Sequence, residues 1–209
     1  MPARSPRRPG RPARRPARPS PRVRDRLLHE AGRLFSRHGV ARVSLRQIAE
    51  SAGVTPAMVH YYFGDKQGLC GAMLGRALAR VLDRVRHLER LDELPEVLVG
   101  TLAAEPWIPP LLVQEILSEG GHFRDRFVAE YASQMTEIVP RLVQAEIAAG
   151  RYRASLDPRL ALLSLIGMVA FPFVARPVLE RVLGVDYDAE VVDRLAEHTL
   201  RVFLAGVRA

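Results

Sequence analysis

Residues 44–69 read SLRQIAESAGVTPAMVHYYFGDKQGL, and this stretch decides the fold. Ser44 is a candidate N-cap for a short helix, and Gly53 stands where such a helix ends and a positive φ is needed. Thr55 is a candidate cap for a second helix, and Pro56 suits its first position, where no backbone N–H is missed. Small residues such as Ala49 let two helices cross closely at a steep angle. The spacing therefore predicts a helix-turn-helix.

The second helix of this pair presents a surface suited to DNA. Short side chains at its start let the backbone approach base edges, and apolar ones meet thymine methyl groups. Tyrosine and lysine near its end supply hydrogen bonds to phosphates. The segment 64–66 opens a further helix, whose free N–H groups form a seat for phosphate. A plain helical hairpin explains the apolar positions equally well, but it does not explain this surface.

Residues 22–69, about a quarter of the chain, closely resemble the DNA-binding domain of TetR/AcrR transcriptional regulators. The motifs that carry the resemblance are Leu34-Phe35, His38-Gly39, Ser44-Leu45-Arg46-Gln47-Ile48-Ala49, Ala52-Gly53-Val54, Val59, Tyr62-Phe63, Lys66 and Leu69. The resemblance implies an all-α protein of about nine helices. An N-terminal three-helix helix-turn-helix DNA-binding domain (22–68) would follow a disordered arm (1–21). A C-terminal helical bundle (69–209) would bind ligand and dimerise.

The resemblance also implies a function: a repressor that binds a palindromic operator in double-stranded DNA as a homodimer and is released by a small hydrophobic or amphipathic effector. Arg46 is expected to recognise guanine through its bidentate fork. The base-side candidates are Arg46, Thr55, Pro56, Ala57, Met58 and Tyr61. The phosphate-side candidates are Ser44, His60, Tyr62 and Lys66. Phe63 is expected to close the core of the domain, and for Tyr62 the same role stays open beside a phosphate contact.

The net charge of +8 is concentrated at the N-terminus. Residues 1–24 hold nine arginines and no acid, so that residues 25–209 carry 22 basic and 23 acidic groups. A proline-rich basic arm of this kind is expected to be disordered in the free protein and to lie along phosphates or enter a minor groove. An inert solvated tail, or a misassigned start codon, explains the same composition.

Other classes of protein find little support in the 209 residues. The six histidines show no metal-ligand spacing, and no nucleophile or phosphate-loop motif is present, so we expect no metal, no cofactor and no enzyme activity. The longest apolar run, 160–174, is too short for a membrane span, and no secretory signal is present. The single Cys70 fits a reducing cytoplasm. A packing role for Cys70 is favoured over a redox role, because no partner for its activation is visible.

The remaining pattern predicts helices at 22–37, 66–90, 95–104, 110–118, 122–149 (bent at Pro140), 158–176 and 188–205. The helix at 158–176 is apolar almost all round, so it needs cover on both sides. Packing against a second subunit would provide that cover. The resemblance implies a four-helix dimer interface built from the last two helices.

A cavity between helices is the expected place for the effector. Its candidate lining is aromatic and methionine-rich, although such a stripe also suits plain core: Trp107, Phe123, Phe127, Tyr131, Met135, Met168, Phe171 and Phe173. In the resembling family the helix at 66–90 transmits the ligand state to the DNA-binding heads, and the ligand acts only through its different affinity for the two states.

Two rival functions remain open. One is a sequence-independent DNA-coating protein driven by the arginine arm. The other is a helical ligand-binding protein that the arm holds at an anionic membrane.

Overall fold

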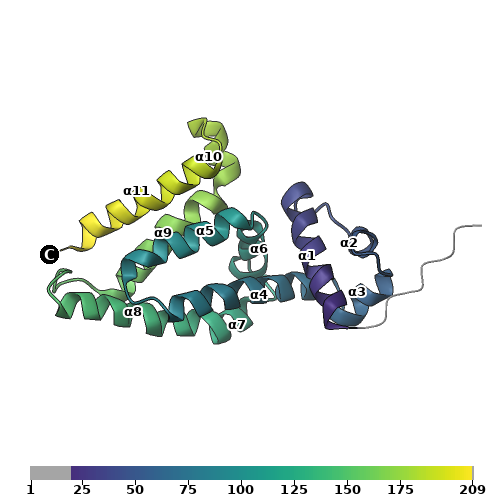
Figure 1. The fold of residues 1–209 in the computed structure, drawn as a ribbon, viewed down its shortest axis with the longest axis horizontal. Helices are drawn as coiled ribbons and strands as arrows, with labels where there is room; N and C mark the ends of the chain where they lie inside the picture. The colour runs from purple at the N-terminus through teal and green to yellow at the C-terminus, as the bar shows by residue number, and fades with distance from the viewer. Residues whose placement is uncertain (1–19, 209) are drawn as a thin grey trace, which may run out of the picture.

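The computed structural model describes residues 20–208, and within that range it confirms the predicted all-α fold. Three helices form the head of the molecule: α1 (Pro21–His38), α2 (Leu45–Ser51) and α3 (Pro56–Phe63). The long helix α4 (Lys66–Arg86) joins this head to a helical body, and the C-terminus lies at the opposite end of the long axis (Figure 1). The N-terminal arm predicted at 1–21 lies almost wholly outside the described residues, and so does its expected role.

Local capping chemistry sets the helices of the head. Ser44 and Gln47 form a reciprocal capping box at the start of α2, in which each side chain accepts from the other residue's backbone N–H. Gly53 takes φ +64° in the turn, as the sequence predicts, and Pro56 opens α3. Thr55 occupies the N-cap position of α3, but its side chain makes no capping hydrogen bond, so the prediction of a Thr55 cap was wrong in that respect. Its hydroxyl stays exposed at the front of α3.

Helix α4 begins where predicted and ends early. The Asp65 carboxylate accepts the N–H of Gly68 over 2.7 Å and caps the first turn. The helix ends at Arg86 rather than at the predicted residue 90. The backbone N–H of Arg90 donates to the Glu93 carboxylate and so starts a separate short turn, Leu91–Glu93. A cap that begins a new turn competes with continuation of the old helix.

The body contains the helices that follow. They are α5 (Leu94–Ala104), α6 (Ile108–Leu112), α7 (Arg124–Phe127), α8 (Ser133–Ala148), α9 (Pro158–Val174), α10 (Arg176–Leu183) and α11 (Ala189–Val207). Two π-helical turns, Val113–Leu117 and Val128–Ala132, extend α6 and join α7 to α8. The predicted helix 122–149 is therefore interrupted, and α10 is an additional helix that begins at Arg176-Pro177 and ends at Gly184 with φ +62°.

Two hydrophobic cores meet along α4. The first holds the head and continues through Met73 and Leu74 to α6 and to Tyr131. The second fills the body between α5, α8, α9 and α11. The head is thus packed against the body through α4 and α6 rather than carried on a free linker.

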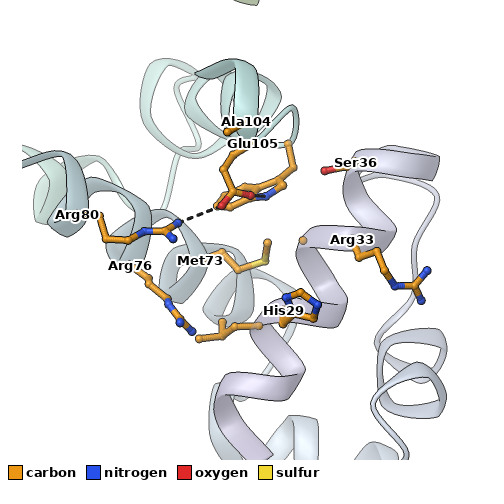
Figure 2. Close-up of a pocket in the computed structure, with 11 residues that line it drawn as sticks. His29, Arg33, Ser36, Met73, Arg76, Arg80, Ala104 and Glu105 are labelled. Carbon is orange, nitrogen blue, oxygen red and sulfur yellow. Dashed lines mark hydrogen bonds and ion pairs between the residues drawn. The ribbon is translucent and has the colours of Figure 1, made fainter. Parts of the chain in front are cut away.

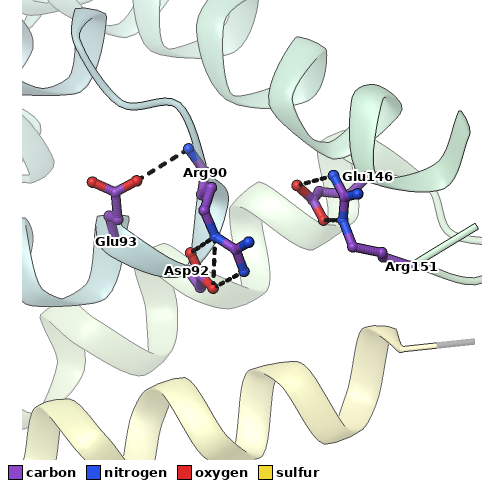
Figure 3. Close-up of polar contacts among 5 residues, drawn as sticks. All are labelled: Arg90, Asp92, Glu93, Glu146 and Arg151. Carbon is purple, nitrogen blue, oxygen red and sulfur yellow. Dashed lines mark hydrogen bonds and ion pairs between the residues drawn. The ribbon is translucent and has the colours of Figure 1, made fainter. Parts of the chain in front are cut away.

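Two ion pairs lie near the end of α8 and beside the turn after α4 (Figure 3). Glu146 on α8 is buried, and its two carboxylate oxygens accept from Arg151 over 2.5 and 3.0 Å. Arg90 pairs with Asp92 beside the turn that follows α4. Both pairs are local, whereas the loop after α8 is tied to the last helix through its backbone: the N–H of Arg153 donates to the carbonyl of Val207 over 2.9 Å.

No single helix within residues 20–208 has the length and hydropathy that a membrane span needs. Two bent pairs reach those values only when taken together: Leu91–Ala104 with Ile108–Leu117, bent by 97°, and Pro158–Val174 with Arg176–Leu183, bent by 74°.

Candidate DNA-binding surface and apolar cavity

The outer face of α3 is formed by the residues that the sequence assigned to bases. Thr55, Pro56, Ala57 and Tyr61 are exposed, and Tyr61 is the most prominent because 69% of its surface is free. Val59 and Phe63 point the other way and are buried in the head. Met58 is only half exposed and packs against the core of the head, so it belongs less to this face than its neighbours do. The face therefore combines a tyrosine with short side chains.

Arg46 lies on α2, next to this face. Its side chain is 81% exposed and pairs with Glu50 one turn later over 3.0 Å. An exposed pair at this spacing is worth only a few tenths of a kcal/mol, so a guanine edge competes with Glu50 at little cost. Ser44 is occupied differently, because its hydroxyl takes part in the capping box with Gln47.

The other three phosphate-side candidates are already engaged with backbone. The Tyr62 hydroxyl donates to the carbonyl of Ser20 over 2.9 Å. The Lys66 ammonium donates to the carbonyl of Val40 over 2.6 Å, in the turn between α1 and α2. The exposed His60 contacts the carbonyl of Gly64 through Nδ1 over 2.6 Å. Tyr62 and Lys66 thus link parts of the head that are distant in the sequence, whereas the His60 contact is local. A structural role was one of two readings of Tyr62 from the sequence, but it was not expected for Lys66.

A further network that joins α1 to α2 was not predicted. The Ser51 hydroxyl donates to Glu30 over 2.5 Å, and Arg33 donates to the Ser51 hydroxyl over 2.7 Å. The hydrogen bond from Ser51, with help from Arg33, lowers the pKa of Glu30. Because the partners are 21 residues apart, no local pattern in the sequence signals the contact.

An apolar cavity of about 170 Å³ lies between α4, α5, α6 and α9. Of the predicted ligand-binding residues, the structure brings Phe127, Tyr131 and Met135 to its wall. The rest of the wall is largely aliphatic: Ala77, Leu78, Val81, Leu82, Leu98, Thr101, Leu102, Ile108, Leu112, Ile166, Val169 and Ala170. The cavity is therefore suited to an apolar ligand.

The two polar side chains of the wall are turned to backbone. Thr101 donates to the carbonyl of Val97 over 2.8 Å, and Tyr131 donates to the carbonyl of Gly75 over 3.2 Å. Burial raises the pKa of the Tyr131 hydroxyl. Both hydroxyl groups therefore donate their hydrogens to backbone carbonyls of the protein. A ligand in this cavity would be recognised by shape and apolar contact.

Five of the predicted ligand-binding residues lie elsewhere. Phe123 is buried against the glycines of α4, and its ring would be 3.3 Å from a Cβ placed at Gly71. Met168 packs in the core of the body, as does Phe173, whereas Phe171 is 62% exposed on α9. Trp107, the fifth, faces the head, so none of the five lines the apolar cavity.

Trp107 belongs to a separate, polar cavity of about 350 Å³ between α1, α4 and the turn after α5 (Figure 2). Its indole N–H donates to Glu105 over 2.6 Å, and Glu105 pairs with Arg80 over 3.1 Å. A Cβ at Gly32 of α1 would come within 3.2 Å of the indole nitrogen. Trp107 thus seats the body closely against the head.

The outer face of α9 is apolar and uncovered. Leu160, Leu163 and Phe171 are each at least 60% exposed, and Val174 continues the same stripe at 36%. A contiguous exposed apolar face on one helix is typical of an interaction surface.

Cys70 is buried one turn into α4. Burial, with a smaller contribution from nearby Glu115, raises the pKa of the thiol to about 12. A thiol held in its protonated form is a poor nucleophile, which supports a packing role.

Comparisons with known proteins agree with this architecture. Residues 27–73 match the family "Bacterial regulatory proteins, tetR family", and residues 88–207, more than half of the chain, match "HTH-type transcriptional dual regulator CecR, C-terminal domain". The chain is 26% identical over 174 residues to the HTH-type transcriptional repressor NicS of Pseudomonas putida. The aligned region covers 79% of this chain and 82% of NicS.

Solved structures share the fold. The ketosteroid transcriptional regulator KstR2 of Mycobacterium tuberculosis superposes with a TM-score of 0.66 at 18% identity, over 94% of this chain and 100% of KstR2. The regulator FadR of Bacillus subtilis, in complex with stearoyl-CoA, gives 0.63 at 17% identity, over 88% of this chain and 99% of FadR. With a matching DNA-binding domain, a matching C-terminal domain and a shared fold, the chain belongs to the TetR family of bacterial transcriptional regulators.

Proposed function

We propose that this protein is a ligand-responsive transcriptional repressor that binds a palindromic operator in double-stranded DNA. The observation that carries the proposal is the outer face of α3, where Tyr61 and short side chains stand free while Val59 and Phe63 anchor the helix in the head. A helix held this rigidly and presented this openly is suited to a major groove. Arg46 would add guanine contacts once it leaves Glu50.

A second copy of the chain is part of the proposal. One short recognition helix reads only a few base pairs, so specificity requires two heads on successive turns of the duplex. The exposed stripe of α9, which includes Leu160, Leu163 and Phe171, supports a homodimer formed through α9 and α11. Within each chain, residues 22–68 would act as the DNA-binding domain and residues 69–209 as the ligand-binding and dimerisation domain, in the cytoplasm.

The effector is proposed to be apolar or amphipathic and to enter the cavity beside Phe127 and Met135. The cavity, at about 170 Å³, is smaller than the range typical of ligand pockets, roughly 300–1,000 Å³. A ligand of ordinary size therefore has to widen the space between α4 and its neighbours. That widening would shift α4 and change the separation of the two heads. The complex of FadR with stearoyl-CoA supports this class of effector.

Fluorescence anisotropy with the DNA upstream of the protein's own gene and with a random duplex tests the proposal. Tyr61→Ala is expected to weaken specific binding by about 1–3 kcal/mol while the dimer persists in sedimentation velocity. Gln114→Ala, which removes an exposed side chain from the body, serves as the matched control and is expected to bind normally. Full operator affinity in Tyr61→Ala would refute the recognition face. Equal affinity for both duplexes at physiological salt would favour a DNA-coating protein instead.

A further inference from the structure

A third space, distinct from the apolar cavity and from the cavity beside Trp107, is a cleft between α4 and α7 with a volume of about 680 Å³. Its floor is the glycine face of α4, formed by Gly68, Gly71 and Gly75. Facing this floor are Phe123 and Tyr131, and the wall is completed by Glu115 from the π-helical turn after α6. Phe123 and Tyr131 pack on this face: a Cβ at Gly71 would lie 3.3 Å from the Phe123 ring, and one at Gly75 would lie 3.3 Å from the Tyr131 hydroxyl. The open part of the cleft therefore lies beside these two side chains.

Glu115 is the unusual residue of this cleft. Only 2% of its surface is exposed, yet its carboxylate makes no hydrogen bond or ion pair with any residue in the described range 20–208. In that range every side-chain oxygen that is fully enclosed has a hydrogen-bond partner. The oxygens of Glu115 have none, so they must reach open space. Glu115 borders the cleft, which is therefore that space. A nearly buried carboxylate that only borders on open space is hydrated less fully than an exposed one, at a cost in free energy. A cation that enters the cleft would relieve that cost.

The cations already in the cleft do not fill this role. Arg76 pairs with Asp25 over 3.1 Å. Arg126 pairs with Glu130 over 2.9 Å. Arg24 lies over the ring of Phe63, 5.5 Å from its centre. Each of these guanidinium groups contacts another residue, and none of them forms an ion pair with Glu115.

The backbone holds Glu115 in place through tight local geometry. Its carbonyl accepts the N–H of Phe123 over 3.0 Å, which closes the loop between the π-helical turn and α7. A Cβ at Gly121 would lie 2.5 Å from the same carbonyl oxygen, so only glycine allows this closure. π-helical turns occur frequently at functional sites. The backbone of Glu115 is thus held by a π-helical turn and by the loop that closes onto it.

The aromatic wall indicates what kind of cation fits. Phe123 and Tyr131 lie with their ring centres 6.2 Å apart, and the guanidinium of Arg126 sits 5.5 Å from the centre of the Phe123 ring. This ring therefore already accepts a cation at its face. Within residues 20–208 no group of three metal-ligating side chains is present, which favours an organic cation over a metal ion.

We propose that this cleft binds a small organic ammonium compound, with Glu115 as its counter-ion and the rings of Phe123 and Tyr131 packed against its apolar part. Tyr131 lines the apolar cavity as well, so the two sites share one wall. Arg24 and Asp65 bring the edge of the head to the cleft. A bound amine therefore touches α4 where it leaves the head, and it constitutes a second input beyond the effector proposed above.

Isothermal titration calorimetry of the full chain with 2-phenylethylamine tests the site without DNA, so its outcome is independent of the repressor proposal. The wild type is expected to bind the protonated amine saturably. Glu115→Gln keeps the shape and removes the charge, and it is expected to lower the affinity by at least about tenfold. Glu119→Gln, an exposed glutamate on the same segment, is the matched control and should bind as the wild type does. The neutral isostere 2-phenylethanol should not bind.

Thermal unfolding of the ligand-free variants provides a second measurement. Glu115→Gln should not melt at a lower temperature than the wild type, because within the described range the carboxylate has no partner to lose. A lower melting temperature would mean that the carboxylate has a structural partner, and it would overturn the proposal. Equal affinity of wild type and Glu115→Gln would do the same, as would equal binding of amine and alcohol. Absence of saturable amine binding in the millimolar range would also overturn it.

Discussion

The hydroxyl of Tyr62, in the last turn of the recognition helix, donates to the carbonyl of Ser20, the residue that caps α1. The backbone N–H of Ser20 donates back to the same hydroxyl. This pair of contacts ties the first and third helices of the head across 42 positions of sequence. Since Ser20 is the first residue that the structure describes, the contact fixes the start of the described chain against α3.

Tyr62→Phe removes this contact and leaves the ring in place. We expect the free energy of unfolding to fall by about 1 kcal/mol, the ordinary net worth of such a hydrogen bond. Urea unfolding followed by circular dichroism measures the change. Tyr61→Phe is the matched control, because Tyr61 is exposed and its hydroxyl makes no hydrogen bond to another described residue of the head. The free energy of unfolding of this variant should change by less than about 0.5 kcal/mol. Equal stability of the two variants would refute the role of Tyr62.

Lys66→Met is expected to loosen the turn between α1 and α2. The ammonium of Lys66 satisfies the carbonyl of Val40 and lies 5.9 Å from the centre of the Phe35 ring, so methionine keeps the packing and loses the hydrogen bond. A hydrogen bond from a charged donor is worth about 1.5–3 kcal/mol. Urea unfolding should show a loss of that order, and the salt dependence of DNA binding should stay unchanged. A salt slope smaller by about 1, with normal stability, would instead indicate a phosphate contact.

Gly68→Ala is expected to disturb the junction of α3 and α4. A Cβ at Gly68 would lie 1.9 Å from the carbonyl oxygen of Phe63, and a backbone atom cannot move aside cheaply. The variant should melt at a lower temperature and bind operator DNA more weakly, because the recognition helix is displaced. Gly100→Ala is the control: no atom lies within 4 Å of its added Cβ, and alanine inside α5 should stabilise by roughly 0.5–1 kcal/mol. Differential scanning calorimetry would separate the two, and equal effects would contradict the steric argument.

The ion pair between buried Glu146 and exposed Arg151 predicts a dependence of stability on pH. The hydrogen bonds from Arg151 lower the pKa of Glu146 below its ordinary range. A carboxyl whose folded-state pKa is lowered contributes stability above its ordinary pKa, and loses it as the pH falls through the lowered value. The difference in melting temperature between wild type and Glu146→Gln should therefore be full at neutral pH and shrink below about pH 4. The exposed Glu137→Gln should show no such trend; a constant difference for Glu146→Gln would contradict the prediction.

Local chemistry made the head predictable. A cap at Ser44, a positive φ at Gly53 and a proline at the start of α3 each act within a few residues, so their effect is visible in the sequence. The engagement of Tyr62 and Lys66 with backbone was not visible, because their partners are 42 and 26 positions away. A tyrosine or lysine near the end of a recognition helix has the same identity whether it faces phosphate or carbonyl.

The cavity was predicted less well, for a geometric reason. A helical face drawn at 3.6 residues per turn through Phe123, Phe127 and Met135 assumes an uninterrupted helix. The π-helical turn Val128–Ala132 widens one turn and changes the register of the side chains that follow. Met135, which follows this turn, reaches the apolar cavity together with Phe127. Phe123 precedes α7 as its N-cap residue, outside the regular helix, and packs against α4. Helix α10 was missed because its two turns are too short for periodicity to separate them from a loop.

Trp107 and Ile108 are consecutive residues, yet they face different compartments. Ile108 borders the apolar cavity, whereas Trp107 presses its indole against Gly32 of α1. The peptide group that joins them is planar and stiff. The wall of the apolar cavity and the contact with α1 are therefore joined by a single peptide bond, between Trp107 and Ile108. We expect a ligand that displaces the side chain of Ile108 to shift Trp107 as well, because the two residues share this rigid peptide group.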